Sequence, residues 1–322
     1  MINDLLSSDI MKLLDIIKSK LKGRYWYARL TSFCHAVVVR INPRYEGNRC
    51  YRKFFGHNVN WENPQDLIEK IMWMSLYSDT SEWTRCADKY KVREYVKECG
   101  LENSLVELYG KWDDIDDIDF DKLPDRFVLK SNHACATVLL VRDKRNLDVQ
   151  ATRKLLKNWL NLKYGYGSVQ LHYTRIKPCI IAEELLTIDD VQRKISPMSL
   201  IDYKFYCCDG EPECVWVAMN RSSRCLDFNL YDMNWNQLRE YIVSNEHYVF
   251  RDIAVPKPKS FDQMKEMCRK LAAPFPQVRV DLYEVNGKPY FGELTFTSGW
   301  SVFTPEFYKY LGSKITLPVD KA

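Results

Sequence analysis

The sequence predicts an α+β protein, in which helices and antiparallel strands alternate along the chain. Several runs of alternating apolar and polar residues are joined by short turns, of which Asn286-Gly287 and the turn near Asp209-Gly210 are the clearest. Other segments carry apolar residues at helical spacing. The chain has 322 residues, of which 46% are hydrophobic, so it can form one large or two to three small domains.

The composition narrows the class of function. A net charge of +4 gives no electrostatic reason to expect a nucleic-acid partner. The eleven cysteines are irregularly spaced without zinc-like pairs, so we expect reduced thiols in a cytoplasmic protein. No apolar run approaches the roughly 20 residues that a membrane span requires. We therefore expect a protein that is at most peripheral to a membrane.

Residues 1–85 are expected to form a mostly helical N-terminal lobe. In residues 9–22, apolar residues recur at helical spacing with lysines between them, which predicts an amphipathic basic helix. This helix either packs on its own domain or attaches the protein to the inner face of an anionic membrane. The aromatic and arginine-rich segment 24–52 forms either an internal core or a wall that binds sugars, and another helix is expected over 65–77.

Residues 86–200 are expected to form a second domain. Its expected elements are helices over 87–99 and 150–163, and strands over 127–130, 138–141 and 179–186. Lys130 ends a strand and precedes a turn of small and polar residues, 131–137. An ammonium group beside the backbone N–H groups of such a turn can bind a phosphate, although a plain hairpin whose lysine reaches solvent is the alternative.

Residues 201–322 are expected to form a third domain, with two hairpins and a helix over 262–271. In the hairpin around Asn286-Gly287, Asp281 and Glu293 are expected to lie near each other on one sheet face. Two carboxylates that close repel each other unless one takes a proton or both share a cation. Such a pair suits Mg²⁺ that carries nucleotide phosphates, and the alternative is an ordinary surface hairpin with charged residues.

Six fragments, in their order and spacing, resemble the TupA-like branch of the ATP-grasp superfamily. They are DKYKVREYV (88–96), LPDRFVLKSNH (123–133), IKPCIIAEELL (176–186), DYKFYCCDGEP (202–212), VRVDLYEVNGKPYFGELTFTSG (278–299) and FTPEFYKYLGSKITLP (303–318). The resemblance covers roughly residues 60–318, and the fragment 278–299 is the most specific. It implies an ATP-grasp fold, in which two α+β subdomains, here 86–200 and 201–322, clamp a nucleotide.

The resemblance also implies roles for individual residues. Lys130 and Arg279 correspond to catalytic residues that neutralise charge on the transferred phosphoryl group. The implied Mg²⁺ ligands are Asp281, Glu293 and Thr295. The implied contacts with ATP are Lys89, Lys130, Ser131, Asn132, His133, Glu183, Leu186, Asp202 and Lys204. Among these, Glu183 and Leu186 resemble the linker that contacts adenine. The turn Ser298-Gly299 resembles the end of the strand that faces the substrate. His133 is also a candidate general base by position, although a lone histidine is more often structural.

The implied reaction is ATP-dependent carboxylate–amine ligation, which forms an amide through an acyl phosphate. The branch implies a bacterial pathway for capsular or other cell-surface polysaccharides, with a uronic-acid carboxylate on the polysaccharide or a small precursor and an amino-acid-like amine. One alternative is a glycosyltransferase of such a pathway, although no Asp-x-Asp stands at an evident strand end. The other is a non-catalytic nucleotide-binding scaffold, because the loop that is usually Gly-Ser-Gly is Ala134-Cys135-Ala136 here. The oligomeric state is left open.

Overall fold

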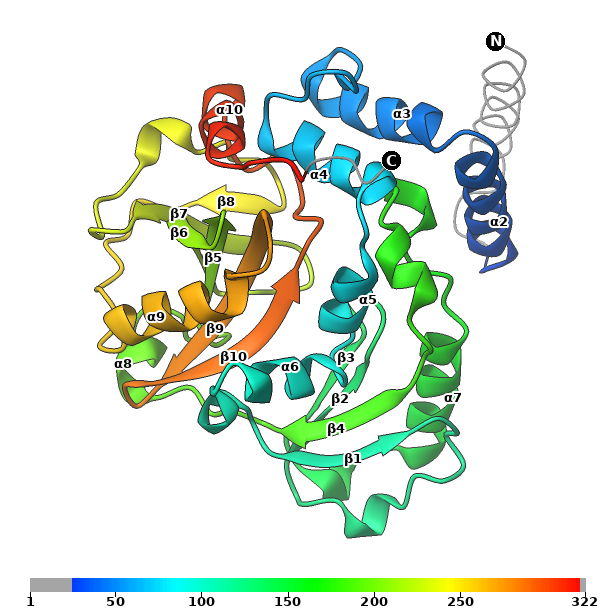
Figure 1. The fold of residues 1–322 in the computed structure, drawn as a ribbon. Helices are drawn as coiled ribbons and strands as arrows, with labels where there is room; N and C mark the ends of the chain where they lie inside the picture. Colours follow the sequence, from blue (N-terminus) through cyan, green and yellow to red (C-terminus); the bar gives the residue numbers. More distant parts are fainter. Residues whose placement is uncertain (1–24, 319–322) are drawn as a thin grey trace.

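The computed structural model describes residues 25–318 and contains two β-sheets with helices between and around them (Figure 1). The four-stranded sheet has the order β1-β4-β2-β3, and all its neighbours are antiparallel. The six-stranded sheet has the order β10-β9-β5-β6-β7-β8, in which only the β7–β8 pair is parallel. The helix expected over 9–22 lies outside the described residues. Helices and antiparallel strands thus alternate, as the sequence predicts.

The described chain begins with helices, and the strands of the two sheets follow them. The helices before the first sheet are α2 (Tyr25–Ile41), α3 (Pro43–Phe55), α4 (Leu67–Tyr77), α5 (Ser81–Ala87) and α6 (Val92–Glu98). The four-stranded sheet contains β1 (Leu108–Trp112), β2 (Phe127–Ser131), β3 (Val138–Val141) and β4 (Ile180–Glu184), with α7 (Val149–Leu160) between the last two. After α8 (Asp190–Arg193) come β5 (Asp202–Cys208), β6 (Glu211–Met219), β7 (Leu226–Asp232), β8 (Tyr248–Phe250), α9 (Phe261–Ala272), β9 (Gln277–Val285), β10 (Lys288–Thr295) and α10 (Pro305–Ser313).

The apolar side chains gather in two main cores. One core joins the N-terminal helices from Cys50 onward to the six-stranded sheet, and the other lies between the four-stranded sheet and α7. The N-terminal helices therefore share a core with the six-stranded sheet, and α5 runs across the boundary proposed after residue 85. The division at 85/86 and 200/201 stays a proposal about segments of the chain.

Two contacts dock the N-terminal helices on the C-terminal part of the chain. Lys70 of α4 donates to the carbonyl oxygens of Gly312 at 2.8 Å and of Ile315 at 2.7 Å, in and after α10. The ring of Trp83 in α5 stacks on Phe296, directly after β10, with 5.1 Å between the ring centroids. These contacts bring α4 and α5 to the end of β10, where the site residues lie (Figure 1).

The predicted helix over 87–99 is wrong at its start. The Oδ1 atom of Asp88 accepts from the backbone N–H of Tyr90 at 2.9 Å and of Lys91 at 3.2 Å, and α6 begins only at Val92. An aspartate side chain that bonds the following backbone in this way competes with the helix. Lys89 therefore lies in a turn rather than on a helix. The strand β1 was not predicted.

Three predictions at the level of the whole chain can be compared with the structure. The turns at Asp209-Gly210 and Asn286-Gly287 have positive φ at both residues, as two-residue hairpin turns of type I′ require. All eleven cysteines are free thiols. From residue 25 to residue 318, no helix has both the length and the apolar character to cross a bilayer.

Candidate active site

The hairpin of β9 and β10 brings the two candidate carboxylates together. The register pairs Asp281 directly with Glu293, and Arg279 with Thr295, so the two carboxylates lie near each other as expected. The strand bulges at Gly292, where a Cβ atom would lie only 2.9 Å from the carbonyl oxygen of Asp281. Only glycine fits this close approach, so Gly292 allows the strand to turn Glu293 toward Asp281.

Two cations hold Asp281, which is 1% exposed. Arg279 donates from Nε to Oδ1 and from a terminal nitrogen to Oδ2, both at 2.7 Å. The same terminal nitrogen lies 3.0 Å from Thr295 Oγ1 and 3.5 Å from Glu293 Oε1. Lys204, on the neighbouring strand β5, also donates to Asp281. The four side chains of the predicted metal and phosphoryl site therefore form one network with Lys204.

The network sets the ionisation of its members. Burial by itself raises the pKa of Asp281, but Arg279 and Lys204 outweigh it and hold this pKa below its usual value. Asp202 lies 2.6 Å from Lys204, yet burial, together with Asp281, leaves the pKa of Asp202 above its usual value. Its Oδ1 atom is buried and has no hydrogen-bond partner among the described residues. Asp202 thus keeps a free acceptor at the site.

Lys130 lies on β2 and is tied to a carboxylate of the neighbouring strand. Its Nζ atom donates to Glu183 Oε2 at 2.7 Å, and Arg93 of α6 donates to the other oxygen of Glu183 at 3.0 Å. Glu183 is 5% exposed. The resemblance implied that Glu183 accepts from adenine, whereas here both of its oxygens already accept from cations. Glu183 therefore holds Lys130 in this structure, and its contact with adenine stays a prediction.

The first three side chains of the predicted phosphate loop are buried in the protein. Ser131 Oγ bonds Thr137 Oγ1 at 2.7 Å, and Asn132 accepts from the backbone N–H of Cys179 at 2.8 Å. His133 is 2% exposed, its Nε2 atom lies 3.3 Å from the carbonyl oxygen of Leu162, and burial lowers its pKa. The side chains of Ser131, Asn132 and His133 therefore shape the loop, and contact of this loop with phosphates through its backbone stays a prediction.

The middle of the loop differs from a glycine loop in its backbone. Ala136 has φ +57°, in the left-handed region that favours glycine, whereas Ala134 does not. The carbonyl oxygen of Ala134 accepts from Lys89 Nζ at 2.8 Å. Lys89 thus contacts the loop directly. Leu186 follows the end of β4 and is half-buried.

Two tyrosines connect the loop with the carboxylate hairpin. The rings of Tyr164 and Tyr173 meet edge to face, with 5.0 Å between their centroids. Burial raises the pKa of Tyr164, and the nearby thiol of Cys135 in the loop and the carboxylate of Glu293 raise it further. The pKa of Tyr173 is raised by burial and by the same two groups. Cys135 and Glu293 therefore both lie near one tyrosine pair, so the loop and the hairpin approach each other there.

The residues present fit Mg²⁺ and the phosphates of ATP. Asp281, Glu293 and Thr295 supply two carboxylates and a hydroxyl, and Mg²⁺ typically takes one or two protein carboxylates with phosphate oxygens and water. Between residues 25 and 318, no cluster of three or more His, Cys, Asp or Glu side chains has the form of a metal site. This donor set suits an ion completed by a nucleotide better than one held by protein alone. The unpartnered Oδ1 of Asp202 suits a hydroxyl donor such as ribose.

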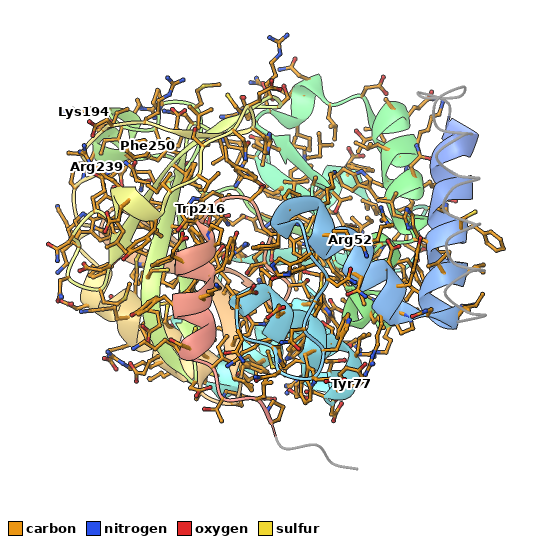
Figure 2. All side chains as sticks on the ribbon, turned by 90° about the horizontal axis from the view of Figure 1, so that it is seen from above. Arg52, Tyr77, Lys194, Trp216, Arg239 and Phe250 are labelled. Atoms are coloured by element: carbon orange, nitrogen blue, oxygen red, sulfur yellow. The ribbon has the colours of Figure 1, made fainter. Side chains whose placement is uncertain are left out.

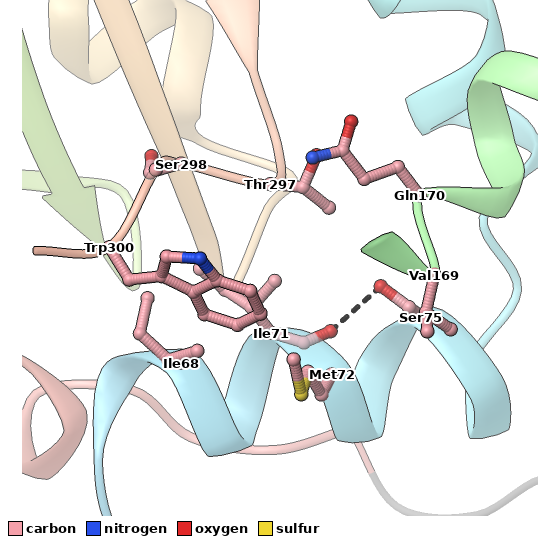
Figure 3. Close-up of a pocket in the computed structure, with 10 residues that line it drawn as sticks. Ile68, Ile71, Met72, Ser75, Val169, Gln170, Thr297, Ser298 and Trp300 are labelled. Carbon is pink, nitrogen blue, oxygen red and sulfur yellow. Dashed lines mark hydrogen bonds between the residues drawn. The ribbon is translucent and has the colours of Figure 1, made fainter. Parts of the chain in front are cut away.

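A cavity of about 150 Å³ lies where the chain leaves β10 (Figure 3). Ile68, Ile71 and Met72 of α4 give it an apolar floor, and Trp300 lies across it. Thr297 and Ser298 line the opposite side, and their buried hydroxyl oxygens have no hydrogen-bond partner in the described part of the chain. Only Ser298 and Gly299 were expected at a substrate. The contribution of α4 was missed, because nothing in its helical pattern indicates what it faces.

A family model described as TupA-like ATPgrasp matches residues 69–316. Among solved structures, D-alanine–D-alanine ligase from Helicobacter pylori is similar at 13% identity and a TM-score of 0.40, over 73% of this chain and 60% of that one. The D-alanine–D-alanine ligase from Bacillus anthracis is similar at 14% identity and a TM-score of 0.39, over 66% of this chain and 57% of that one. The ATP-grasp ligase PsnB complexed with a minimal precursor is similar at 12% identity and a TM-score of 0.38, over 70% of this chain and 56% of that one.

The chain thus spans less than two thirds of the length of these solved structures. At these scores they add nothing to the assignment, and no curated protein matches the sequence. The family model, in contrast, covers most of the chain, and its range includes Lys89, Lys130 and the whole hairpin of β9 and β10. The chain therefore belongs to the TupA-like ATP-grasp family.

Proposed function

We propose that this protein is a carboxylate–amine ligase that uses ATP and Mg²⁺ to form an amide. The observation that carries the proposal is the cross-strand pair Asp281 and Glu293, bonded by Arg279, with Glu293 near the same tyrosine, Tyr164, as Cys135 of the loop that follows Lys130. A surface hairpin with ordinary charges would leave these groups in solvent, whereas Asp281 is buried and held by two cations. Maintaining a buried charged network costs solvation energy, which favours a functional role.

The chemistry explains why such a site needs cations and no protein nucleophile. A carboxylate is a poor acyl donor because its oxygen leaves with difficulty. When that oxygen attacks the terminal phosphorus of ATP, the bond to ADP breaks and an acyl phosphate forms. The amine then attacks the carbonyl carbon, phosphate leaves with the carbon–oxygen electron pair, and the nitrogen loses a proton. Mg²⁺, when bound, neutralises charge on the phosphate oxygens.

Lys130 and Arg279 stabilise the negative charge that moves across the phosphoryl group. Positioning and electrostatic stabilisation of this kind carry most of the catalysis in phosphoryl transfer. Arg279 presents a planar guanidinium already oriented by Asp281, so little reorganisation is needed when charge develops. His133 is not assigned as the base, because it is buried against a carbonyl oxygen and its pKa is lowered.

The proposed substrates are a uronic-acid carboxylate of a capsular or other cell-surface polysaccharide, or of its precursor, and an amino-acid-like amine. The cavity beyond β10 supports an amine of this size, since its volume is about 150 Å³. Its unpartnered hydroxyls at Thr297 and Ser298 can bond the polar end of an amino acid, while Ile68 and Met72 contact an apolar side chain. The proposed place of the reaction is the cytoplasm, where ATP is supplied.

The test is to incubate the purified protein with Mg²⁺, ATP and panels of uronates and amines, and to measure ADP and phosphate. Release that requires both a uronate and an amine, with an amide product in the mass spectrum, supports the proposal. Consumption of a sugar nucleotide with no ADP would instead identify a glycosyltransferase. Binding of ATP with no turnover on any pair would identify a non-catalytic scaffold.

A further inference from the structure

A second cavity lies along α3 and the loop that follows it, and the proposed reaction does not use it. Its volume is about 520 Å³, and the side chains on which its chemistry depends are Arg44, Asn48, Arg49, Arg52, Asn58 and Trp61. Among the described residues that line it, none is acidic. The sequence left open whether segment 24–52 forms a core or a sugar-binding wall. The structure divides it, because Tyr51 is buried in the core while Arg44 and Arg52 are exposed in this groove.

Two of the arginines give the groove its excess positive charge. The Arg44 guanidinium lies 5.2 Å from the ring of Tyr77 and 5.8 Å from that of Trp61, and its Nε donates to the Tyr77 hydroxyl. Arg52 donates from Nε to Asn58 Oδ1 at 3.0 Å. Among residues 33–318, neither Arg44 nor Arg52 forms a salt bridge with an Asp or Glu side chain. Figure 2 shows Arg52 on α3 and Tyr77 at the end of α4.

Arg49 adds a third guanidinium whose charge is balanced. It donates to both oxygens of the buried Glu46, at 2.9 and 2.6 Å. Asn48 is fixed as a neutral donor, because its Oδ1 accepts from Val59 N at 3.1 Å and from Trp61 Nε1 at 3.0 Å. Its amide N–H groups therefore remain for a ligand. The lining thus offers oriented donors, charged and neutral, to a ligand rich in acceptors.

The groove is connected with the cavity beyond β10 through α3. The ring of Phe54 lies 5.7 Å from that of Trp300, which crosses the smaller cavity. On the same helix, the Cys50 thiol donates to the carbonyl oxygen of Gly167 at 3.4 Å, two residues before Val169, which also lines the smaller cavity. A single helix therefore contributes to the larger groove and packs on the walls of the smaller one.

We propose that the groove binds the carboxylate-bearing sugar units of an extended acidic oligosaccharide, beyond the unit that reacts. This inference rests on the proposed function. Guanidinium groups bind carboxylates in a bidentate manner, and amide groups such as that of Asn48 bond sugar hydroxyls. A site for phosphate alone would need neither the amides nor a volume more than three times that of the other cavity, 520 against 150 Å³. The groove therefore selects a chain of uronates over a single one.

The experiment measures binding to the full chain without ATP, by calorimetry, so that it does not depend on turnover. The probes are a galacturonic-acid oligomer, a neutral glucose oligomer of the same length, inorganic pyrophosphate, and vesicles with anionic phospholipid. We expect only the galacturonic-acid oligomer to bind, and Arg52→Gln or Arg44→Gln to weaken it at least tenfold. Arg52→Lys is expected to recover part of the loss. Lys53→Gln removes the same charge from the exposed neighbour outside the groove and is expected to change the affinity less than twofold.

Several results would overturn the inference. Equal binding of the neutral oligomer would remove the role of charge, and an equal loss in Lys53→Gln would show a general surface effect. Pyrophosphate or vesicles that bind as well, and lose affinity in the same variants, would identify a phosphate or membrane site. Arg52 is exposed, so thermal melting should show a folded Arg52→Gln protein. If no uronate–amine pair releases ADP while the oligomer still binds through Arg52, the proposed reaction fails and the groove stands. If a uronate–amine pair releases ADP while the oligomer does not bind through Arg52, the proposed reaction stands and only the inference about the groove is refuted.

Discussion

Replacing Lys130 by methionine removes the ammonium group and keeps an unbranched side chain. The Lys130 side chain is 27% exposed, and its Nζ atom lies 2.7 Å from Oε2 of the buried Glu183. In the variant, Glu183 retains Arg93 at 3.0 Å, so its charge stays paired. We therefore expect only about 1 kcal/mol of lost stability, which corresponds to a fall of about 2–4 °C in Tm.

Activity should respond far more strongly than stability. Loss of one oriented donor at a developing negative charge costs about 2.7–4 kcal/mol, or a factor of about 10²–10³ in kcat. The assay is ADP release with saturating ATP and an active uronate–amine pair, alongside thermal melting. Affinity for a fluorescent ATP analogue, measured in the same preparations, separates loss of binding from loss of the chemical step.

The matched control is Lys157→Met on α7. Lys157 is 55% exposed and lies 3.4 Å from a carboxylate oxygen of Asp116, far along the chain from the hairpin of β9 and β10. It should keep the activity of the wild type. A folded Lys130→Met protein with kcat within threefold of the wild type would refute the assignment of Lys130, and so would an equal loss in Lys157→Met.

Four further predictions follow from the site. Glu183→Gln should lower kcat about tenfold or more with a smaller change in ATP affinity, because it releases the Lys130 ammonium group. If Glu183 instead recognises adenine, the variant should lose the preference for ATP over GTP in binding. Ala136→Gly removes about 1 kcal/mol of left-handed backbone strain at φ +57°, but the glycine raises the conformational entropy of the unfolded chain by a similar free energy, so Tm should stay unchanged. The kcat should stay equal or rise. A large loss of kcat would contradict this prediction. Gly292→Ala would place a Cβ atom 2.9 Å from the carbonyl oxygen of Asp281. Urea denaturation should therefore show that the free energy of unfolding falls by about 1–3 kcal/mol, and turnover should be lost. An active and stable variant would show that the bulge is not tight. The pKa of Asp281 is lowered in the folded state, so the ionised carboxylate stabilises the fold above the unfolded pKa of about 3.9, and this stabilisation is lost as the pH falls through the folded pKa. The difference in unfolding free energy between wild type and Asp281→Asn should therefore shrink in acid. A difference that is constant from pH 7 to 3 would contradict this prediction.

The hairpin could be predicted because its signals are local. Alternating residues in 278–294 fix which side chains share a face, and Asn286-Gly287 fixes the register, since both residues adopt positive φ. Continued without a break, that register would set Asp281 opposite Gly292, and the bulge at Gly292 shifts the pairing by one residue so that Asp281 lies opposite Glu293. The pairing of Lys130 with a loop of small residues was readable for the same reason.

The loop shows where local signals end. From sequence, Ser131, Asn132 and His133 read as polar residues exposed to a phosphate. In the structure their side chains bond Thr137, the backbone near Cys179 and a carbonyl oxygen, because a buried polar group must find a partner wherever the fold supplies one. Which partner is nearby is decided by the packing of distant segments.

The sequence by itself determined the α+β class, the two hairpin turns and the order of motifs that identifies the family. Only the tertiary structure decided which charges meet. Lys204 and Asp281 are 77 residues apart and Arg93 and Glu183 are 90 apart, yet each pair forms one bond. Periodicity and turn chemistry act over a few residues, whereas these contacts, and the joining of α4 to the end of β10, depend on how the apolar faces of whole elements are buried together.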